Sequence, residues 1–224
     1  MVFLNLDAGE LDTETEALWS LADVLSCACG GHAGDVLSMA RVAGFCASHP
    51  QVRLGAHPAY MDREHFGRRS VAVEPLMLAR QIGAQCGALA GVAGERGLSI
   101  GTVKPHGALY HDAARDPAIA AAVLHGATVA LGDAITIIGP ATGALADAAT
   151  RRGLRYAREG FADRRLRADG SLVPRGEPDA LITDPQEAAR QAVRLAAQVD
   201  TICVHADTPN ALAIARAVRE AIRA

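Results

Sequence analysis

The amino-acid sequence predicts an α/β fold in which about seven parallel strands, each followed by a helix, close into a distorted TIM-like barrel. Short aliphatic runs alternate with longer alanine-rich segments of helical period, a pattern typical of repeated strand–helix units. The length of 224 residues suits one barrel domain covering residues 1–224. Aspartate followed by proline at 116–117 and 184–185 marks two helix starts. An open doubly wound sheet has the same local pattern, but seven such units favour the barrel.

The strands and helices follow from these runs in chain order. Strands are expected at 3–6, 25–28, 52–56, 100–104, 134–138, 154–158 and 201–204. Helices are expected near 13–24, 34–48, 74–96, 116–131, 142–152, 184–198 and 208–223. The segment 161–182 is rich in Arg, Asp, Gly and Pro and predicts a long irregular loop. Loops of this length are usually functional or disordered, and its arginines suggest closure over an anion.

Composition narrows the classes of partner. The net charge of −3 provides no basic surface for a phosphate backbone, so nucleic acid is not expected as a partner. No apolar stretch reaches the length of about 20 residues that a membrane helix needs. The first residues also lack the layout of a signal peptide, and a cytoplasmic protein is expected. The five cysteines, an odd number, are expected to be reduced thiols.

Polar residues gather directly after the predicted strands. In parallel α/β folds, reactive groups collect at the carboxyl ends of the strands. Four of the eight histidines follow four different strands, and a barrel would direct them toward one mouth. Such imidazoles and nearby carboxylates can bind a divalent metal, relay protons or hold phosphate. The residues are His32, His57, His106 and His205.

Lys104 is the only lysine among the 22 lysine and arginine residues, and it lies two residues before His106. A lysine provides a compact, titratable cation that the planar fork of arginine does not replace. The placement therefore favours a functional role for Lys104 over a compositional accident.

Three further features of the strand ends are compatible with a ligand site. Gly30 and Gly34 flank His32 before a helix, where backbone amides could receive an anion, although glycine also serves tight turns. Cys29 is an alternative candidate for a nucleophile. Aromatic side chains in these loops could form a ligand wall or pack beneath the loops; they are Tyr60, Phe66, Tyr110 and Phe161.

Taken together, these motifs resemble the LamB/YcsF family over nearly the whole chain. The resemblance implies a barrel related to the polysaccharide deacetylase and glycoside hydrolase barrels. It also implies the activity of the A subunit of bacterial 5-oxoprolinase, which hydrolyses 5-oxoproline to glutamate using ATP, together with the B and C subunits as partners. The motifs that carry the resemblance are Asn5-x-Asp7-x-Gly9-Glu10, Ala28-Cys29-Gly30-x-His32-Ala33-Gly34-Asp35, Gly55-Ala56-His57-Pro58-x-Tyr60, Phe66-Gly67-Arg68-Arg69, Val103 to Tyr110, Phe161-Ala162-Asp163-Arg164 and Cys203-Val204-His205-x-Asp207-Thr208.

This activity gives the strand-end residues expected roles. Lys104, with Arg68 or Arg164, would neutralise phosphate charge. A divalent metal, Mg²⁺ in the first instance, would accompany ATP. The candidates for its ligands are Asp7, Glu10 and Asp35. The remaining candidates are His32, His57 and His106 as acid, base or ligand, Asp7 as a catalytic group, and Gly30, Gly34 and Tyr110 as cofactor contacts.

Two other functions stay open. A metal-dependent amidohydrolase or deacetylase acting without ATP would hold zinc with Asp7, His57 and His106. A non-catalytic subunit would only bind the ligand, leaving the chemistry to its partners. The sequence leaves self-association into a homo-oligomer open as well.

Overall fold

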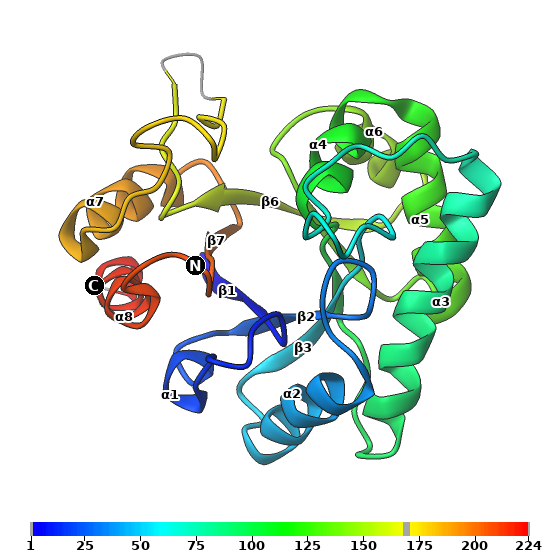
Figure 1. The fold of residues 1–224 in the computed structure, drawn as a ribbon, viewed down its shortest axis with the longest axis horizontal. Coiled ribbons are helices and arrows are strands. Elements are labelled where there is room, and N and C mark those ends of the chain that lie inside the picture. Colours follow the sequence, from blue (N-terminus) through cyan, green and yellow to red (C-terminus); the bar gives the residue numbers. More distant parts are fainter. Residues whose placement is uncertain (1, 168–170, 224) are drawn as a thin grey trace.

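The strands of the computed structural model form a closed, all-parallel barrel in which neighbours along the chain are neighbours in space, and β7 returns to β1 (Figure 1). The structure describes residues 2–167 and 171–223. The predicted barrel is confirmed, and the open sheet is excluded by the β1–β7 pairing, in which Leu4 lies opposite Ile202. The strands are β1 (Phe3–Ala8), β2 (Val24–Ala28), β3 (Arg53–His57), β4 (Thr102–Val103), β5 (Thr136–Gly139), β6 (Arg155–Phe161) and β7 (Thr201–Val204).

Helices surround the ring of strands (Figure 1). The two predicted Asp-Pro starts are confirmed, since Asp116 and Asp184 cap α5 and α7 with their side chains. No described helix is long and apolar enough to cross a membrane. The helices are α1 (Glu16–Trp19), α2 (Val36–Ser48), α3 (Pro75–Gly94), α4 (Gly107–Arg115), α5 (Pro117–Leu131), α6 (Ala144–Arg151), α7 (Pro185–Ala196) and α8 (Ala211–Arg223).

Two helix predictions need correction. The helix expected at 13–24 is reduced to the four residues of α1, because the Asp23 side chain accepts a hydrogen bond from the backbone of Leu4 and the chain enters β2 at once. In contrast, α4 was not predicted. It begins directly after His106, so the end of β4 and the start of a helix are only a few residues apart.

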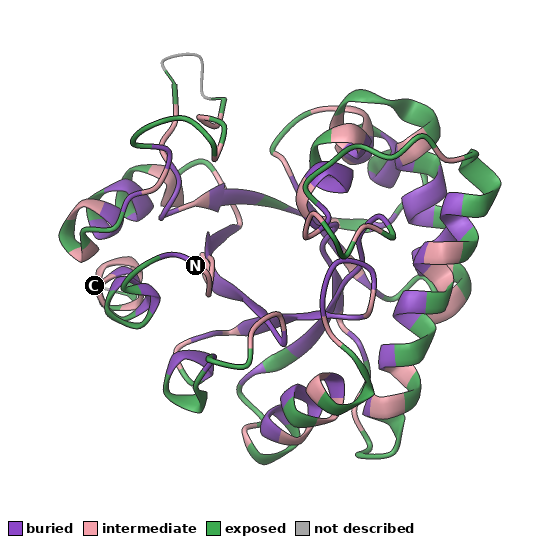
Figure 2. Cartoon of the chain, viewed as in Figure 1, coloured by how far each residue is buried: buried purple, intermediate pink, exposed green. Residues whose placement is uncertain are grey.

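The core fills the barrel and the layer between the strands and the helices. The strands are largely buried, and the helices turn their exposed faces outward (Figure 2). Most of the buried side chains are aliphatic or alanine, as burial of apolar surface requires. The exceptions lie in the strands and just beyond their carboxyl ends, and they include Asn5, Asp7, Lys104 and Glu159. These buried polar groups define the candidate site.

The segment between β6 and α7 is more ordered than a loop. Its chain folds back on itself through antiparallel bridges that pair Arg164 with Leu181 and Leu166 with Leu172. Part of the predicted loop, residues 168–170, lies outside the described residues. The described part stands beside α7 and forms one wall of the cavity discussed next (Figure 1).

Candidate active site

A cavity of about 510 Å³ opens at the carboxyl ends of the strands. Its lining includes Asp7 from β1, His57 from β3 and Lys104 and His106 from the chain after β4. His205, directly after β7, completes this part of the lining. Residues from the two ends of the sequence therefore meet at one place, as the barrel predicts.

Lys104 lies at the centre of a buried polar network. Its Nζ is 2.5 Å from Asp7 Oδ1 and 3.2 Å from Glu159 Oε1. It also donates to Asn5 Oδ1 and to Cys203 Sγ, each at 3.1 Å. Since the side chain is only 3% exposed, the ammonium is largely removed from water and is neutralised by two carboxylates.

The charges of this network fix one another. Burial opposes the charged form of Lys104, but the Asp7 carboxylate and its neighbours outweigh burial and hold the lysine pKa well above its usual range. Burial also opposes ionisation of Asp7, yet His57 and Lys104 hold the pKa of Asp7 well below its usual range. Lys104 is therefore the counter-ion of the site and has little capacity left for a phosphate group. The predicted phosphate-neutralising role is better suited to the arginines described below.

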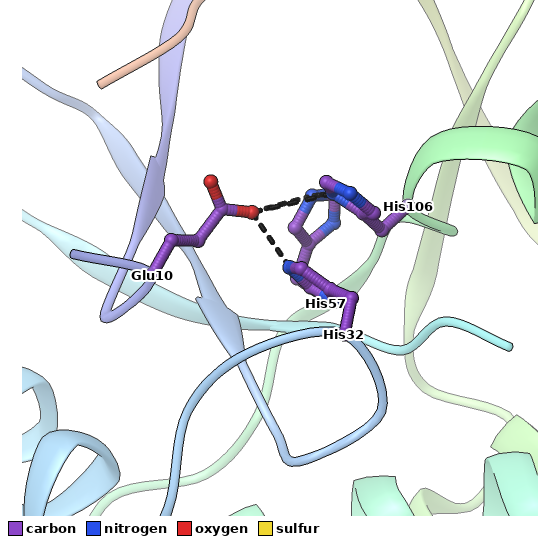
Figure 3. Close-up of side chains that lie close together, drawn as sticks. All are labelled: Glu10, His32, His57 and His106. Carbon is purple, nitrogen blue, oxygen red and sulfur yellow. Dashed lines mark hydrogen bonds and ion pairs between the residues drawn. The ribbon is translucent and has the colours of Figure 1, made fainter. Parts of the chain in front are cut away.

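A second group, called here the imidazole cluster, consists of Glu10, His32, His57 and His106 (Figure 3). Glu10 Oε1 lies 2.7 Å from His32 Nε2, 3.2 Å from His106 Nδ1 and 3.7 Å from His57 Nε2. The rings of His32 and His106 stack at 3.5 Å. Burial is the largest influence on Glu10 and would raise its pKa, but hydrogen bonds from His106 and His32 bring it well below the usual range.

Glu14 fixes the chain that carries Glu10. Its carboxylate accepts hydrogen bonds from the backbone of Gly9, Glu10 and Leu11 and from the indole of Trp19. Burial raises the pKa of Glu14. Four donors on one buried side chain hold the turn after β1 in place, so Glu14 positions Glu10 without touching the cavity.

His205 and Asp163 form a buried pair at the opposite side of the mouth. Asp163 Oδ1 is 2.9 Å from His205 Nδ1, and its other oxygen accepts from the His205 backbone and from the Thr208 hydroxyl. Although burial opposes ionisation of Asp163, the charge of His205 and these hydrogen bonds lower its pKa. The carboxylate therefore holds the proton on Nδ1 and leaves Nε2, 3.9 Å from Asp7 Oδ2, on the cavity side.

Five arginines line the same cavity and are called here the arginine wall: Arg68, Arg115, Arg164, Arg167 and Arg175. Arg68 and Arg175 share Asp207, while Arg115 and Arg167 pair with carboxylates of their own. Arg164 is 7% exposed, and among the described residues no carboxylate forms an ion pair with it. Its Nη2 donates to the Val173 carbonyl, and its buried Nε has no partner in the described chain.

Arg164 is therefore a buried cation that lacks a counter-ion. Burial and the nearby charge of Arg175 lower its pKa to about 10, so it stays charged at neutral pH. Burying an unpaired charge is costly, and an anionic ligand group would relieve that cost. The arrangement suits a carboxylate or a phosphate group in the cavity.

Several predicted site residues lie elsewhere. Asp35 does not join Asp7 and Glu10, because its exposed side chain caps α2 by accepting from Ser38, so the predicted three-carboxylate magnesium site is wrong. Gly30 and Gly34 form a turn in which their carbonyls accept from Arg63, and neither lines the cavity. Left-handed backbone at both positions explains the glycines without an anion.

Other predicted residues change their place within the site. His32 lies behind the cavity wall and contacts Glu10, so it orients a neighbour and does not face a ligand. Tyr110 lines the cavity, and burial together with Glu159 raises its pKa well above the usual range. Burial also raises the pKa of Cys29 far above normal, which argues against a nucleophilic thiolate.

Sequence reasoning did not assign roles to Glu159, Asp163, His205, Arg175 and Glu14. Four of them carried a usable signal, because Glu159, Asp163 and His205 lie at strand ends and Arg175 belongs to the arginine-rich segment. Glu14 gave none, since its role depends on four donors that only the folded turn brings together.

A closed parallel barrel with buried carboxylates, lysine and imidazoles at its strand ends and arginines around the mouth defines a barrel protein with a small-molecule site for an anionic ligand. The family model described as LamB/YcsF family matches residues 4–224. The chain belongs to the LamB/YcsF family.

Named relatives cover almost the whole chain. It is 43% identical over 236 residues to the 5-oxoprolinase A subunit of Methylococcus capsulatus, covering 96% of this chain and 90% of that protein. It is 40% identical to the protein of the same name from Chloroflexus aggregans, with 99% and 94% covered. Among solved structures, the lactam utilization protein from Thermus thermophilus matches with a TM-score of 0.89 and 34% identity, covering 99% of this chain and 96% of that one.

Proposed function

We propose that this chain is the A subunit of an ATP-dependent 5-oxoprolinase, which hydrolyses 5-oxo-L-proline to L-glutamate as ATP is cleaved to ADP and phosphate. The observation that carries this proposal is the identity of 40–43% over at least 96% of the chain with proteins that bear the name of the 5-oxoprolinase A subunit. The arginine wall supports it, because 5-oxoproline carries a carboxylate and an ATP-activated form would add a phosphate.

The proposed reaction activates a poor electrophile. The lactam oxygen takes the γ-phosphoryl group of ATP, ADP leaves, and water adds to the activated ring carbon. The ring C–N bond then breaks as nitrogen takes up a proton, and hydrolysis of the resulting acyl phosphate releases phosphate and leaves glutamate. Each step moves a proton or develops negative charge, so the site needs an acid–base group and fixed cations.

The residues of the cavity can be matched to these needs. His205 Nε2, held toward the cavity by Asp163, would move the proton at the ring nitrogen or at water. Arg164, with Arg68 and Arg175, would hold the carboxylate or phosphate. Lys104 would keep Asp7 ionised and in place. Tyr110 would pack against the ligand from the side of Glu159.

Magnesium in this proposal arrives with ATP. Of the three carboxylates predicted to bind it, Asp35 lies apart, Asp7 is paired with Lys104, and Glu10 is engaged by imidazoles. Phosphate oxygens supply most of the Mg²⁺ ligands in many ATP-dependent enzymes. We therefore propose no set of protein ligands for magnesium here.

The B and C subunits complete the proposed enzyme. The name shared by the relatives, which marks them as one lettered component, implies an assembly with other subunits. We propose that the chain acts as one barrel domain in the cytoplasm, where ATP is present, together with these subunits. The predicted relation to polysaccharide deacetylase barrels and the state of self-association stay predictions.

The decisive experiment measures glutamate formed from 5-oxoproline by the full chain with and without the B and C subunits, and with and without ATP. We expect glutamate and ADP in equal amounts only when ATP and all three components are present. Glutamate formed without ATP would favour the metal-dependent amidohydrolase instead. Binding of 5-oxoproline without turnover in any combination would favour a ligand-binding subunit.

A matched pair of variants links this assay to the cavity. Asp163→Asn removes the carboxylate that orients His205, whereas Asp147→Asn removes an exposed carboxylate on α6. We expect glutamate formation to fall strongly only in Asp163→Asn. Equal activity of the two variants would place the chemistry outside this cavity.

A further inference from the structure

The imidazole cluster contains two ring nitrogens whose lone pairs face each other. His57 Nδ1 lies 2.7 Å from the carbonyl oxygen of Lys104, and His106 Nε2 lies 3.0 Å from the carbonyl oxygen of Phe66. A carbonyl oxygen only accepts hydrogen bonds, so each of these nitrogens carries the proton of its neutral ring. His57 Nε2 and His106 Nδ1 are then both unprotonated, and they are 2.9 Å apart.

Two lone pairs at this distance repel unless a cation lies between or beside them. The nearest carboxylate oxygen, Glu10 Oε1, completes a triangle with them at 3.2 Å and 3.7 Å. All three side chains are at most 7% exposed. Nitrogen and oxygen donors that converge in a buried place, with an anion among them, are the ordinary ligands of a divalent metal ion.

We propose that Glu10, His57 and His106 form a binding site for one divalent transition-metal ion of the zinc class. Tetrahedral zinc with bonds of about 2.0–2.2 Å separates its ligand atoms by about 3.3–3.6 Å. The three measured separations of 2.9, 3.2 and 3.7 Å bracket that range. Two imidazoles with one carboxylate suit zinc or iron better than Mg²⁺, which prefers oxygen ligands.

The surroundings of the three ligands have the form of an outer shell. Histidines that bind metals commonly donate their other N–H to a backbone carbonyl or a carboxylate, as both His57 and His106 do here. His32 Nε2 contacts Glu10 Oε1 at 2.7 Å and stacks on His106, which fixes the orientation of both. These contacts hold the ligand atoms in place before an ion binds.

The loop over the cluster shows the same constraint in its backbone. Phe66 adopts a φ of 54°, which side-chain-bearing residues rarely do, and this conformation places its carbonyl on His106. At Gly67, a Cβ would lie 2.8 Å from the Cβ of His32 and 3.0 Å from the His106 ring. The glycine therefore lets the loop close directly onto the imidazoles.

A second convergence of donors does not serve as well. Asp7, Cys203 and His205 also approach one another, but Lys104 Nζ already lies 2.5 Å from Asp7 and 3.1 Å from Cys203. The cation of that group is the lysine. For the same reason, the zinc site predicted from Asp7, His57 and His106 is revised, and Glu10 replaces Asp7 as the carboxylate.

The site can be tested without 5-oxoproline or ATP, so its failure is distinct from failure of the proposed function. The full chain is stripped with a chelator and titrated with Zn²⁺ or Mg²⁺ in a calorimeter, and bound metal is counted by elemental analysis. We expect one Zn²⁺ per chain and no comparable binding of Mg²⁺. Visible absorption of the Co²⁺ form should show few-coordinate nitrogen and oxygen ligation.

Variants separate this cluster from other histidines. Glu10→Gln and His106→Gln should each weaken Zn²⁺ binding by about 100-fold or more. His65→Gln is the matched control, because His65 also pairs with a carboxylate, Asp62, at 2.7 Å but lies on the surface. It should leave the affinity of the stoichiometric site unchanged.

The proposal also survives a variant that fails to fold, since nitrogen NMR of the wild-type histidines reports on the same atoms. Zn²⁺ should shift His57 Nε2 and His106 Nδ1 and leave their other nitrogens protonated. A proton shared by the two rings and unaffected by Zn²⁺ would overturn the metal site, as would full affinity in both cluster variants.

Discussion

The imidazole cluster and the arginine wall lie at one mouth of the barrel, yet they are built for opposite charges. In the cluster, unprotonated nitrogens and a carboxylate point at one another within 3.7 Å, so the missing component is positive. In the wall, Arg164 is a buried cation without a carboxylate among the described residues, so the missing component is negative. A barrel can hold both because different strands supply them.

The two regions also differ in how their groups are fixed. Members of the cluster are held by backbone carbonyls and by the turn that Glu14 organises. The wall depends on long guanidinium side chains, several of which are partly exposed and pair with surface carboxylates. We infer that the cluster contributes precise geometry and that the wall contributes charge. Lys104 and His205 lie between them and belong to neither.

The largest effect is expected where Lys104 joins the two regions. Lys104→Met leaves Asp7 and Glu159 buried without their shared cation, and removing one partner of a buried ion pair costs about 3–5 kcal/mol. Urea unfolding should show this loss. Arg158→Met is the control, because Arg158 pairs with Asp200 at the surface and its loss should change stability little. Equal stability of the two variants would contradict the central role of Lys104.

The next effect concerns proton transfer by His205. His205→Gln keeps a polar side chain but no titratable nitrogen, so kcat in the reconstituted 5-oxoprolinase assay should fall about 100-fold or more. KM should change less, because the arginine wall is intact. His111→Gln, a histidine that also lines the cavity but contacts no carboxylate ion pair among the described residues, should change kcat less than tenfold. A similar loss in both would remove the special role of His205.

A smaller effect is expected for the arginine wall. Arg164→Leu removes the cation without a counter-ion, and KM for 5-oxoproline should rise about tenfold, which corresponds to about 1.4 kcal/mol. Arg164→Lys should be intermediate, since it keeps the charge and loses the fork. The exposed Arg194 on α7 provides the control, Arg194→Leu. An unchanged KM in Arg164→Leu would show that the anion binds elsewhere.

The smallest effect concerns pH and Asp163. Its pKa is lowered in the folded state, so its contribution to stability is complete above the unfolded value of about 3.9 and is lost as pH falls below it. In Asp163→Asn, the decline of unfolding free energy below about pH 4 should flatten by up to about 1.4 kcal/mol per pH unit. Denaturant unfolding at several acidic pH values measures the slope. A slope as steep as that of the wild type would contradict the assigned pKa direction.

The sequence predicted most of the fold because strands and helix starts depend on local patterns. All seven strands were placed within a few residues, and Asp116 and Asp184 were identified as caps from the proline that follows each. The helix expected at 13–24 was wrong because tertiary contacts of Asp23 and Glu14 shorten it. The helix α4 was missed because the motif containing Lys104 and His106 left no room for a separate helix signal.

For the site, the sequence determined which chemical groups reach the mouth of the barrel. The strand-end positions of Asp7, His57, Lys104 and His106 followed from the alternation of strands and helices, which is local and periodic. Their roles depended on atoms a few ångströms apart that come from distant parts of the chain. Only the tertiary structure decided that Lys104 serves two carboxylates, that Asp35 caps a helix, and that Glu10 meets His57 and His106, because electrostatic and hydrogen-bond partners are set by three-dimensional distance.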